Sequence, residues 1–306
     1  MPSRFQIREA VVKFLYCADL KGGTAFSASR DQSWDFVTES DRRRLHLDTF
    51  RNVHFVALDF KRETRLVEFI ERQSMAVAIL AAWPQAESLK TGLERIAELE
   101  SRWSSSIANL ERLPKDDDDE SVEERFGDEL EAFFSINHDL VAARKRFLQD
   151  LEDFPELEKK MEAVVATILR LQRISDLVGM VEEPENYPQR ANLAPLRKTK
   201  AKIKKLRQKA DELVDSIIDR QENIDETLAG VVENFASERI DPVDRAILRL
   251  ATHEILHTAT PPRVAINEAI DLAKRFGTTD SKRFVNGVLD RIAQQAAGKS
   301  KTGRAL

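Results

Sequence analysis

Hydrophobic side chains recur every three or four residues along most of the chain, which is the spacing of amphipathic helices. The pattern is most regular near the C-terminus, where it predicts three consecutive helices. Asp241 can cap the first of them, and Pro242 occupies the first helical position, where its missing N–H costs nothing. Pro261 and Pro262 end this helix, and we expect Gly277 to be the C-cap of the second.

The third of these helices begins after Thr279 or Asp280, because either residue can cap it. Gly287 lies inside it and predicts a close approach by a neighbouring backbone. The apolar positions of the three helices are, in order, Ile247, Leu248, Ala251, Ile255 and Leu256, then Ile266, Ala269, Ile270, Ala273 and Phe276, and then Phe284, Val285, Val288, Leu289 and Ile292.

The N-terminus predicts a further amphipathic helix, which Ser3 can cap and Gly22–Gly23 ends. Its apolar face consists of Ile7, Ala10, Val11, Phe14, Leu15 and Ala18. Off that face lie Arg4, Arg8, Lys13 and Tyr16. Such polar residues form a solvated helix face in most proteins, so the pattern alone assigns them no function.

The middle of the chain predicts several long helices. Trp34, Phe36 and Val37 can anchor a short helix within residues 24–40. From Leu89 to Leu110 the apolar positions step by three or four residues, which is typical of an antiparallel hairpin or a coiled coil. Further helices are expected over 47–83 (as one helix or two), 126–151, 157–178 and from 196 onwards, with loops at 116–119 and 182–195.

The composition suits a soluble helical protein. A third of the 306 residues are charged, and the formal net charge of −5 argues against a non-specific nucleic-acid coat, although it allows a local basic patch. Cys17 is the single cysteine, so an intrachain disulfide and a cysteine-rich metal site are excluded. No signal peptide or membrane-spanning run is evident, and we expect a cytoplasmic protein without a cofactor.

Three C-terminal segments resemble the NusB family of bacterial transcription antitermination factors: DRAILRLATHEIL, PPRVAINEAIDLAKRFG and DSKRFVNGVLDRIA. Residues 205–237 and the N-terminal segment REAVVKFLY are also similar to the family, but less closely. The resemblance implies a small all-helical bundle that binds the boxA element of nascent RNA together with ribosomal protein NusE. The family carries a run of basic residues at its start, whereas this chain retains two arginines there, with Phe5 and Ile7 between them.

The length of the chain implies an insertion, because NusB-family members are about half as long. We therefore expect an all-α protein in which residues 1–40 and 204–296 form a discontinuous NusB-like RNA- and protein-binding domain. Residues 41–203 would be an inserted helical domain, either a bundle or a long antiparallel coiled-coil hairpin. Residues 297–306 are expected to be a disordered tail.

The resemblance also implies functional residues. It places an RNA-binding surface on the first helix and at the start of the last one, where cations can hold phosphates and an aromatic ring can stack on an unpaired base. The implied RNA-binding residues are Arg4, Arg8, Lys13, Tyr16, Asp280, Ser281, Lys282, Arg283 and Phe284. Glu254 is the implied partner-binding residue, expected to be exposed and to face NusE. A cap at Asp280, solvated cations at 282 and 283, and a core Phe284 remain the alternative.

Two other patterns carry weaker signals. His253-Glu254-Ile255-Leu256-His257 has the H-E-x-x-H spacing of a zinc hydrolase, but it lies inside the segment that resembles a family without a metal. A run of lysines between Lys198 and Lys209 can be an extra electrostatic patch for RNA or a solvated helix face.

The sequence thus leads to three functional readings. The first is a non-enzymatic antitermination factor that binds boxA-type single-stranded RNA with NusE at the transcription elongation complex and supports rRNA transcription. The alternative is a NusB-derived protein-interaction scaffold that has lost RNA binding, which the thinned basic start favours. A zinc hydrolase is a distant third. Self-association into a homodimer is left open.

Overall fold

A computed structural model of the chain describes residues 1–20, 30–114, 120–232 and 240–302. Every regular element within these ranges is helical, which confirms the predicted fold class. None of these helices combines the length and the apolar character that crossing a membrane requires. The chain divides into two units: Met1–Glu39 with Ala201–Leu306, and Ser40–Lys200. That the second unit is an inserted domain, predicted over residues 41–203, stays a prediction.

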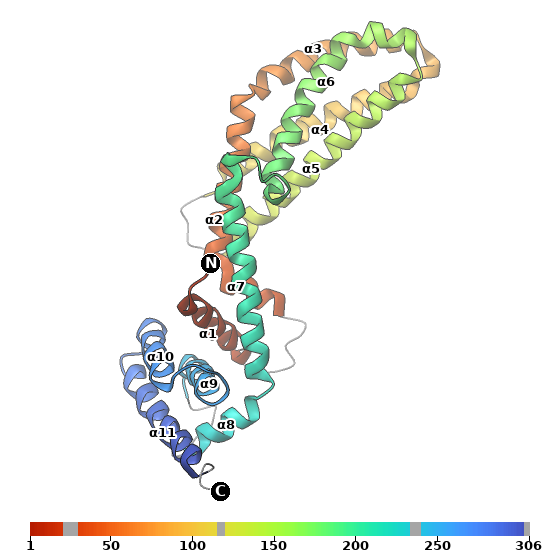
Figure 1. The fold of residues 1–306 in the computed structure, drawn as a ribbon. Coiled ribbons are helices and arrows are strands. Elements are labelled where there is room, and N and C mark those ends of the chain that lie inside the picture. Colours follow the sequence, from red (N-terminus) through yellow and green to blue (C-terminus); the bar gives the residue numbers. More distant parts are fainter. Residues whose placement is uncertain (21–29, 115–119, 233–239, 303–306) are drawn as a thin grey trace. The chain divides into compact units, whose positions relative to one another are not determined.

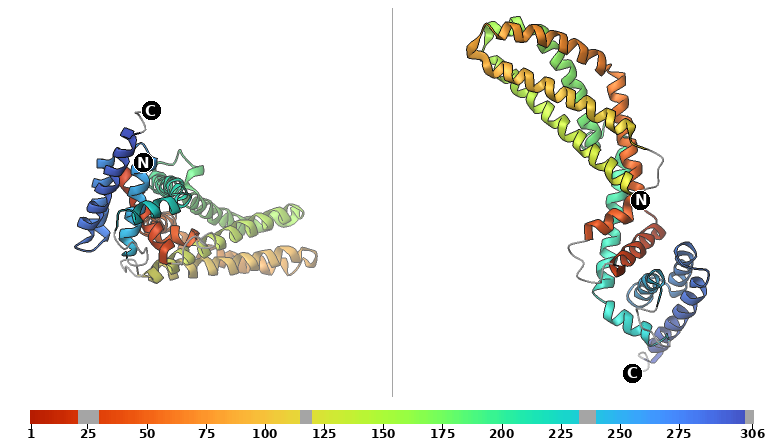
Figure 2. Two further views of the ribbon diagram at one scale, coloured as in Figure 1. Left: turned by 90° about the horizontal axis from the view of Figure 1, so that it is seen from below. Right: turned by 180° about the vertical axis from the view of Figure 1, so that it is seen from behind.

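The first unit is arranged around one helix, α9 (Pro242–His257). Eleven of its 16 residues are buried. It packs mainly against four helices: α1 (Arg4–Leu20), α8 (Gln221–Ala229), α10 (Pro262–Phe276) and α11 (Ser281–Thr302). Figure 1 shows α1, α10 and α11 around α9, and the views in Figure 2 agree. The two ends of the sequence therefore share one hydrophobic core.

Partly buried ion pairs hold α1 against α9. Arg249 donates to Asp19 of α1 (2.8 Å) and to both carboxylate oxygens of Asp225 of α8 (2.8 Å each). Arg245 donates to the same Asp19 at 2.7 Å. These two carboxylates raise the pKa of Arg249 even though burial alone lowers it. A single arginine thus ties three helices of the first unit together.

The residues that the sequence predicts as caps do cap the start of α9 and the end of α10. The Asp241 carboxylate accepts the Val243 N–H at 2.9 Å, with Pro242 at the first helical position, as predicted. Gly277 caps α10, yet its backbone is extended, with φ −91°. Glycine is needed there because a Cβ would lie 2.6 Å from the Ser281 side chain. The prediction for Gly287 is wrong, since a Cβ there would meet nothing within 4 Å.

The second unit contains four long helices: α3 (Arg62–Leu80), α4 (Glu87–Arg112), α5 (Glu120–Glu152) and α6 (Pro155–Glu182). The helix α4 packs on α5, α5 on α6, and α3 on both α4 and α6, which makes a bundle rather than a two-helix hairpin. The seam of α4 is buried as predicted, at Leu89, Leu93, Ile96, Leu99, Trp103 and Leu110. The described residues of the second unit also contain three short 3-10 turns: η2 (Pro84–Ala86), η3 (Pro184–Asn186) and η4 (Ala191–Leu193).

A buried charge cluster lies inside this bundle. Glu100 receives one hydrogen bond from Arg62 (2.5 Å) and one from Arg144, and all three side chains are almost fully buried. The Arg62 guanidinium also lies 3.6 Å from the centroid of the Trp103 ring. Burial lowers the pKa of Arg62 to about 10, although Glu100 opposes this. One carboxylate therefore balances two buried cations.

Two helices belong to both units. The helix α2 (Arg30–Asp59) is far longer than the short helix predicted within 24–40, and α7 (Ala194–Ile218) carries the lysine run. Trp34 and Val37 are buried in the first unit's core as expected, but Phe36 is 38% exposed. The apolar run 47–83 forms two helices, separated at Lys61, which has a left-handed φ of 51°.

Some predictions concern residues at the edge of the described ranges. The Gly22–Gly23 stop and the acidic run 116–119 lie outside them. The helix α11 continues to Thr302, so the predicted tail, 297–306, begins as helix, and residues 303–306 lie outside the description.

Candidate functional site

Arg8 of α1 and Glu254 of α9 form a buried ion pair. The Arg8 Nε donates to both carboxylate oxygens, at 2.9 and 3.1 Å, and its Nη1 lies 3.2 Å from Glu268 of α10. Arg8 is 5% exposed and Glu254 is 6% exposed, so the prediction that Glu254 is an exposed acid is wrong. The reason is that α9 is surrounded by other helices, and a carboxylate there needs a buried cation. Burial raises the pKa of Glu254, while Arg8 and Arg4 oppose that rise.

A cleft of about 280 Å³ opens above this pair. Its lining residues are Arg4, Ile7, Arg8, Leu213, Glu254, Ala259, Thr260 and Pro261. Arg4 is exposed at its rim and forms no hydrogen bond or ion pair with any residue in the described ranges. The cleft thus offers one available guanidinium over an apolar and partly charged floor, which is suited to a phosphate or a carboxylate.

Lys13 and Tyr16 lie on another side of α1, toward the end of α10. The Lys13 Nζ is 3.5 Å from Glu9 and 5.8 Å from the centroid of the Phe276 ring. Arg275 shares the same Glu9 carboxylate at 3.3 Å. Two cations compete for one acid, so this group retains a net positive charge. Tyr16 is half-buried and packs against the core of the first unit.

At the start of α11 the structure separates the predicted residues into two groups. Ser281 is 1% exposed, accepts the Thr278 N–H (2.8 Å) and donates to Asp244 (3.0 Å), so the prediction that its hydroxyl holds phosphate is wrong. The Ser281 side chain packs closely against the backbone at Gly277, which keeps its hydroxyl buried. Burial raises the pKa of Asp244, although its bond with Ser281 opposes this.

The remaining residues at this helix start are accessible. Lys282 and Arg283 are exposed and pair with no other residue that the structure describes, and Asp280 is exposed beside them. Phe284 is half-buried and packs against the core, which combines the two alternatives for this side chain. The surface here consists of two available cations next to a partly exposed aromatic ring.

The H-E-x-x-H motif does not converge on a metal site. His253 is 2% exposed, and its Nε2 lies 2.9 Å from the Ser216 hydroxyl. Its ring centroid is 5.5 Å from that of His257, but Glu254 between them is paired with Arg8. Burial, His257 and Arg220 lower the pKa of His253 to about 4. Within the described residues, no three potential ligands gather around one point.

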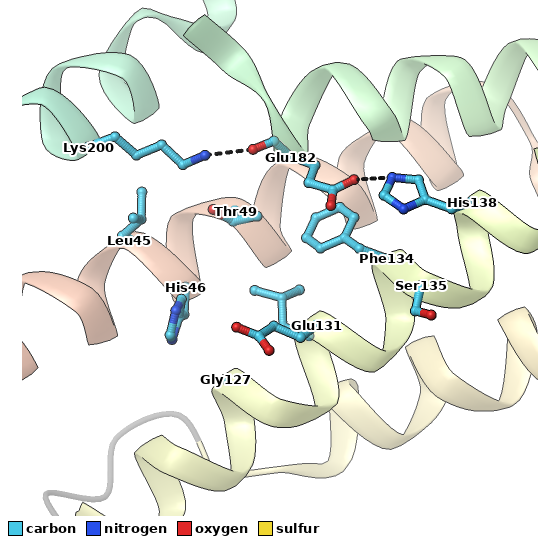
Figure 3. Close-up of a pocket in the computed structure, with 11 residues that line it drawn as sticks. Leu45, His46, Thr49, Gly127, Glu131, Phe134, Ser135, His138, Glu182 and Lys200 are labelled. Atoms are coloured by element: carbon cyan, nitrogen blue, oxygen red, sulfur yellow. Dashed lines mark hydrogen bonds and ion pairs between the residues drawn. The ribbon is translucent and has the colours of Figure 1, made fainter. Parts of the chain in front are cut away.

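A second hollow, of about 440 Å³, lies in the second unit (Figure 3). The His138 Nε2 is 2.8 Å from the Glu182 carboxylate, and the Lys200 Nζ donates to the main-chain oxygen of Glu182 at 2.6 Å. Gly127 leaves room for His46, whose ring would lie 3.1 Å from a Cβ at that position. Glu182 thus contacts both His138 and Lys200, and this arrangement indicates no particular ligand.

Comparison with known proteins bears on the first unit. The profile of the NusB family matches residues 159–294. The chain is 42% identical over 88 residues to the transcription antitermination protein NusB of Macrococcus caseolyticus, covering 29% of this chain and 68% of that protein. It is 42% identical over 99 residues to the Thermotoga maritima protein of the same name, covering 32% and 70%. The chain belongs to the NusB family.

Other relatives of the NusB family give a similar picture. The Anaeromyxobacter NusB is 46% identical over 84 residues, or 59% of its length. A solved structure of T. maritima NusB shares 38% identity and covers 35% of this chain and 81% of its own, with a TM-score of 0.30. The NusB family is non-enzymatic, which agrees with the prediction that this chain is a non-enzymatic factor.

The NusB match does not coincide with the first unit. It includes residues 159–200, which belong to the second unit, and it omits α1. The placement of α1 therefore depends on its packing against α9 and on the Arg8–Glu254 and Asp19–Arg249 pairs. Sequence reasoning missed both pairs. No local signal in the sequence reveals them, because α9 reads as an amphipathic helix and other helices bury Glu254 and Arg249 only in the folded unit.

Proposed function

We propose that this NusB-family protein is a transcription antitermination factor that binds boxA-type single-stranded RNA together with ribosomal protein NusE and so supports rRNA transcription. One observation carries the proposal: the first unit holds Arg4, Lys282 and Arg283 as exposed cations that pair with no described residue, on the two helices where the resemblance places RNA. The relatives that carry the antitermination name support it.

We assign the predicted RNA residues to two roles. Arg4, Lys13, Lys282 and Arg283 would bind phosphates, while Tyr16 and Phe284 would offer aromatic surface to unpaired bases. Lys13 adjoins Phe276, and Gly277 then leads into α11, so Lys13 and the start of α11 can form one surface, while Arg4 lies on another side of α1, at the cleft. Arg8, Ser281 and Asp280 would act as positioning residues that hold α1 and the helix start.

NusE is proposed to bind next to the cleft. Glu254 lines the floor of that cleft but is paired with Arg8, so it would set the position of α1 rather than meet the partner as a free charge. The rim at Ala259, Thr260 and Pro261 is where a partner can reach this floor. Joint binding would tether the RNA to the elongation complex.

The test is the fluorescence anisotropy of a labelled boxA-type RNA titrated with the full chain, with and without NusE. A Lys282→Gln/Arg283→Gln variant should weaken RNA binding and reduce its salt dependence, since each lost phosphate contact lowers the slope of log K against log salt by about 0.7. Arg95→Gln, which alters an exposed pair in the second unit, is the matched control. Equal affinity for the variant, the control and the unaltered chain would reject the site.

An interaction scaffold remains the second candidate, because one observation favours it. The second unit exposes large apolar side chains: Phe55 (63%) and Leu58 (61%) on α2, and Val67 (55%) and Ile70 (50%) on α3. Exposed apolar residues at helical spacing are typical of helix-binding surfaces. An unaltered chain that shows no salt-dependent RNA binding would favour this function over the first.

A further inference from the structure

Residues 201–210 of α7 are strongly basic, whereas residues 211–218 of the same helix, also in the first unit, contain the acids Asp211, Glu212 and Asp215. Residues 201–210 contain five cations and no acid, in a chain whose net charge is −5. Arg207 is neutralised by Asp31 and by Asp211, which lies 3.8 Å from its Nε. Lys204, Lys205 and Lys209 are exposed and form no hydrogen bond or ion pair with any residue that the structure describes. Excess positive charge is thus concentrated on one short stretch of helix.

The helical spacing places some of these lysines on one side of α7. Lys202, Lys205 and Lys209 follow at i, i+3 and i+7, and Leu213 continues the same row at i+11. Leu213 lines the cleft that Arg4 borders. Lys209 lies about 6 Å along the helix axis from Leu213, and Lys205 about 12 Å, at 1.5 Å per residue. The lysine row, defined as Lys205 and Lys209, therefore leads away from the Arg4 cleft.

The chemistry of the row fits a chain of phosphates better than a protein surface. Like charges one helical turn apart repel each other, and a polyanion removes that repulsion. Lysine is a flexible point charge that suits phosphate oxygens without base specificity. An interface with a protein needs aromatic or aliphatic anchors, whereas Ala201 and Gln208 are the uncharged residues exposed beside the row.

We propose that the lysine row binds the phosphates of the RNA strand where it leaves the Arg4 cleft, so that the RNA-binding surface continues from α1 onto α7. This inference rests on the proposed function, because the cleft supplies the anchored part of the RNA. The row adds affinity and salt dependence but no sequence specificity. It acts on nucleotides that flank the boxA-type element rather than on the element itself.

The experiment compares two RNAs with the full chain. One RNA contains only the boxA-type element, and the other has the same element flanked by uridines on both sides. The variant Lys205→Gln/Lys209→Gln retains good helix formers and removes two charges. The matched control is Lys145→Gln/Lys159→Gln, which removes two exposed lysines from the second unit. Circular dichroism and thermal unfolding verify that each variant folds.

We expect the row variant to bind the short RNA as the unaltered chain does. On the flanked RNA its binding should be weaker, and the slope of log K against log salt should be smaller by about 1.4, or about 0.7 for each of two lost phosphate contacts. The control should match the unaltered chain on both RNAs. A Lys205→Glu/Lys209→Glu variant should weaken binding of the flanked RNA further.

Equal slopes for the row variant and the unaltered chain on the flanked RNA would overturn the inference. So would unchanged RNA binding together with lost binding of an acidic polypeptide such as polyglutamate, because the row would then serve an acidic protein. If the unaltered chain does not bind the short RNA, the proposed function fails. In that case a lysine-dependent slope on the flanked RNA alone still supports the row.

Discussion

Arg8 and Glu254 are 246 positions apart in sequence, and the Nε of one donates to both carboxylate oxygens of the other. This buried pair joins the first helix of the chain to the central helix of the first unit. It places Arg4, one turn earlier, at the rim of a cleft that α9 lines from below.

Removing one member of this pair should unfold the first unit more easily. In Arg8→Ala the Glu254 carboxylate loses its main counter-charge, and breaking a buried pair in this way costs about 3–5 kcal/mol of unfolding free energy. Arg8→Met with Glu254→Leu should cost much less, because neither member of the pair is left buried and unpaired, and Glu268, which also contacts Arg8, is only partly buried. Thermal and urea unfolding of the full chain measure both. Equal losses for the single and double variants would contradict a charge-based explanation.

The second unit should depend on Glu100. Glu100→Gln leaves Arg62 and Arg144 buried without a carboxylate, and we expect a loss of about 3–5 kcal/mol in the unfolding free energy. Glu98→Gln changes an exposed carboxylate on the same helix, paired with Arg95 at 2.8 Å, and should cost less than about 0.5 kcal/mol. Denaturant unfolding distinguishes the two. A stable Glu100→Gln protein would show that the cluster does not need its negative charge.

The stability of the first unit should depend on pH through His253. Its folded pKa of about 4 lies below its usual value of 6.5, so the unfolded chain binds the proton more readily. The contribution of neutral His253 to the free energy of unfolding is fully present above pH 6.5. It is lost as pH falls from 6.5 to 4, by about 3 kcal/mol at most. Unfolding midpoints between pH 7 and pH 4 measure this loss. His253→Gln should flatten this part of the profile, whereas His257→Gln should largely preserve it.

Two glycines offer a matched comparison. Gly277→Ala places a Cβ 2.6 Å from the Ser281 side chain and 2.8 Å from the Ala273 oxygen, so the turn must shift, at a cost of about 1–3 kcal/mol. Gly287→Ala adds a methyl group that meets nothing within 4 Å inside a helix, and should stabilise the protein by about 0.5–1 kcal/mol. Opposite shifts in the thermal midpoint are expected, and a neutral Gly277→Ala would contradict the close approach of Ser281.

Much of the fold could be predicted from the sequence, because helix caps and apolar periodicity depend on neighbouring residues alone. Asp241 and Pro242 start α9, and the apolar seam of α4 is buried, as periodicity predicts. The break between α2 and α3 falls at Lys61, whose backbone is left-handed. A lysine does not predict this conformation, because residues with a side chain rarely adopt it. The turn before α11 depends on contact between Gly277 and Ser281, which spacing alone does not reveal.

The candidate site was harder to predict, because its residues depend on distant partners. Glu254 follows a histidine in an amphipathic pattern and looks exposed until α1 brings Arg8 over it. Ser281 resembles a phosphate ligand in the sequence, but in the structure its hydroxyl donates a hydrogen bond to Asp244 of another helix. Arg4, Lys282 and Arg283 are exposed, as cations on a solvated helix face are expected to be, and their role in RNA binding stays a prediction.

The most direct test of RNA binding by the first unit is amide hydrogen exchange of the full chain, with and without boxA-type RNA and NusE. We predict slower exchange on binding at the start of α1, around residues 4–8, and at the start of α11, around residues 280–284. Protection confined to residues 40–200, or no change at either helix start, would contradict the account.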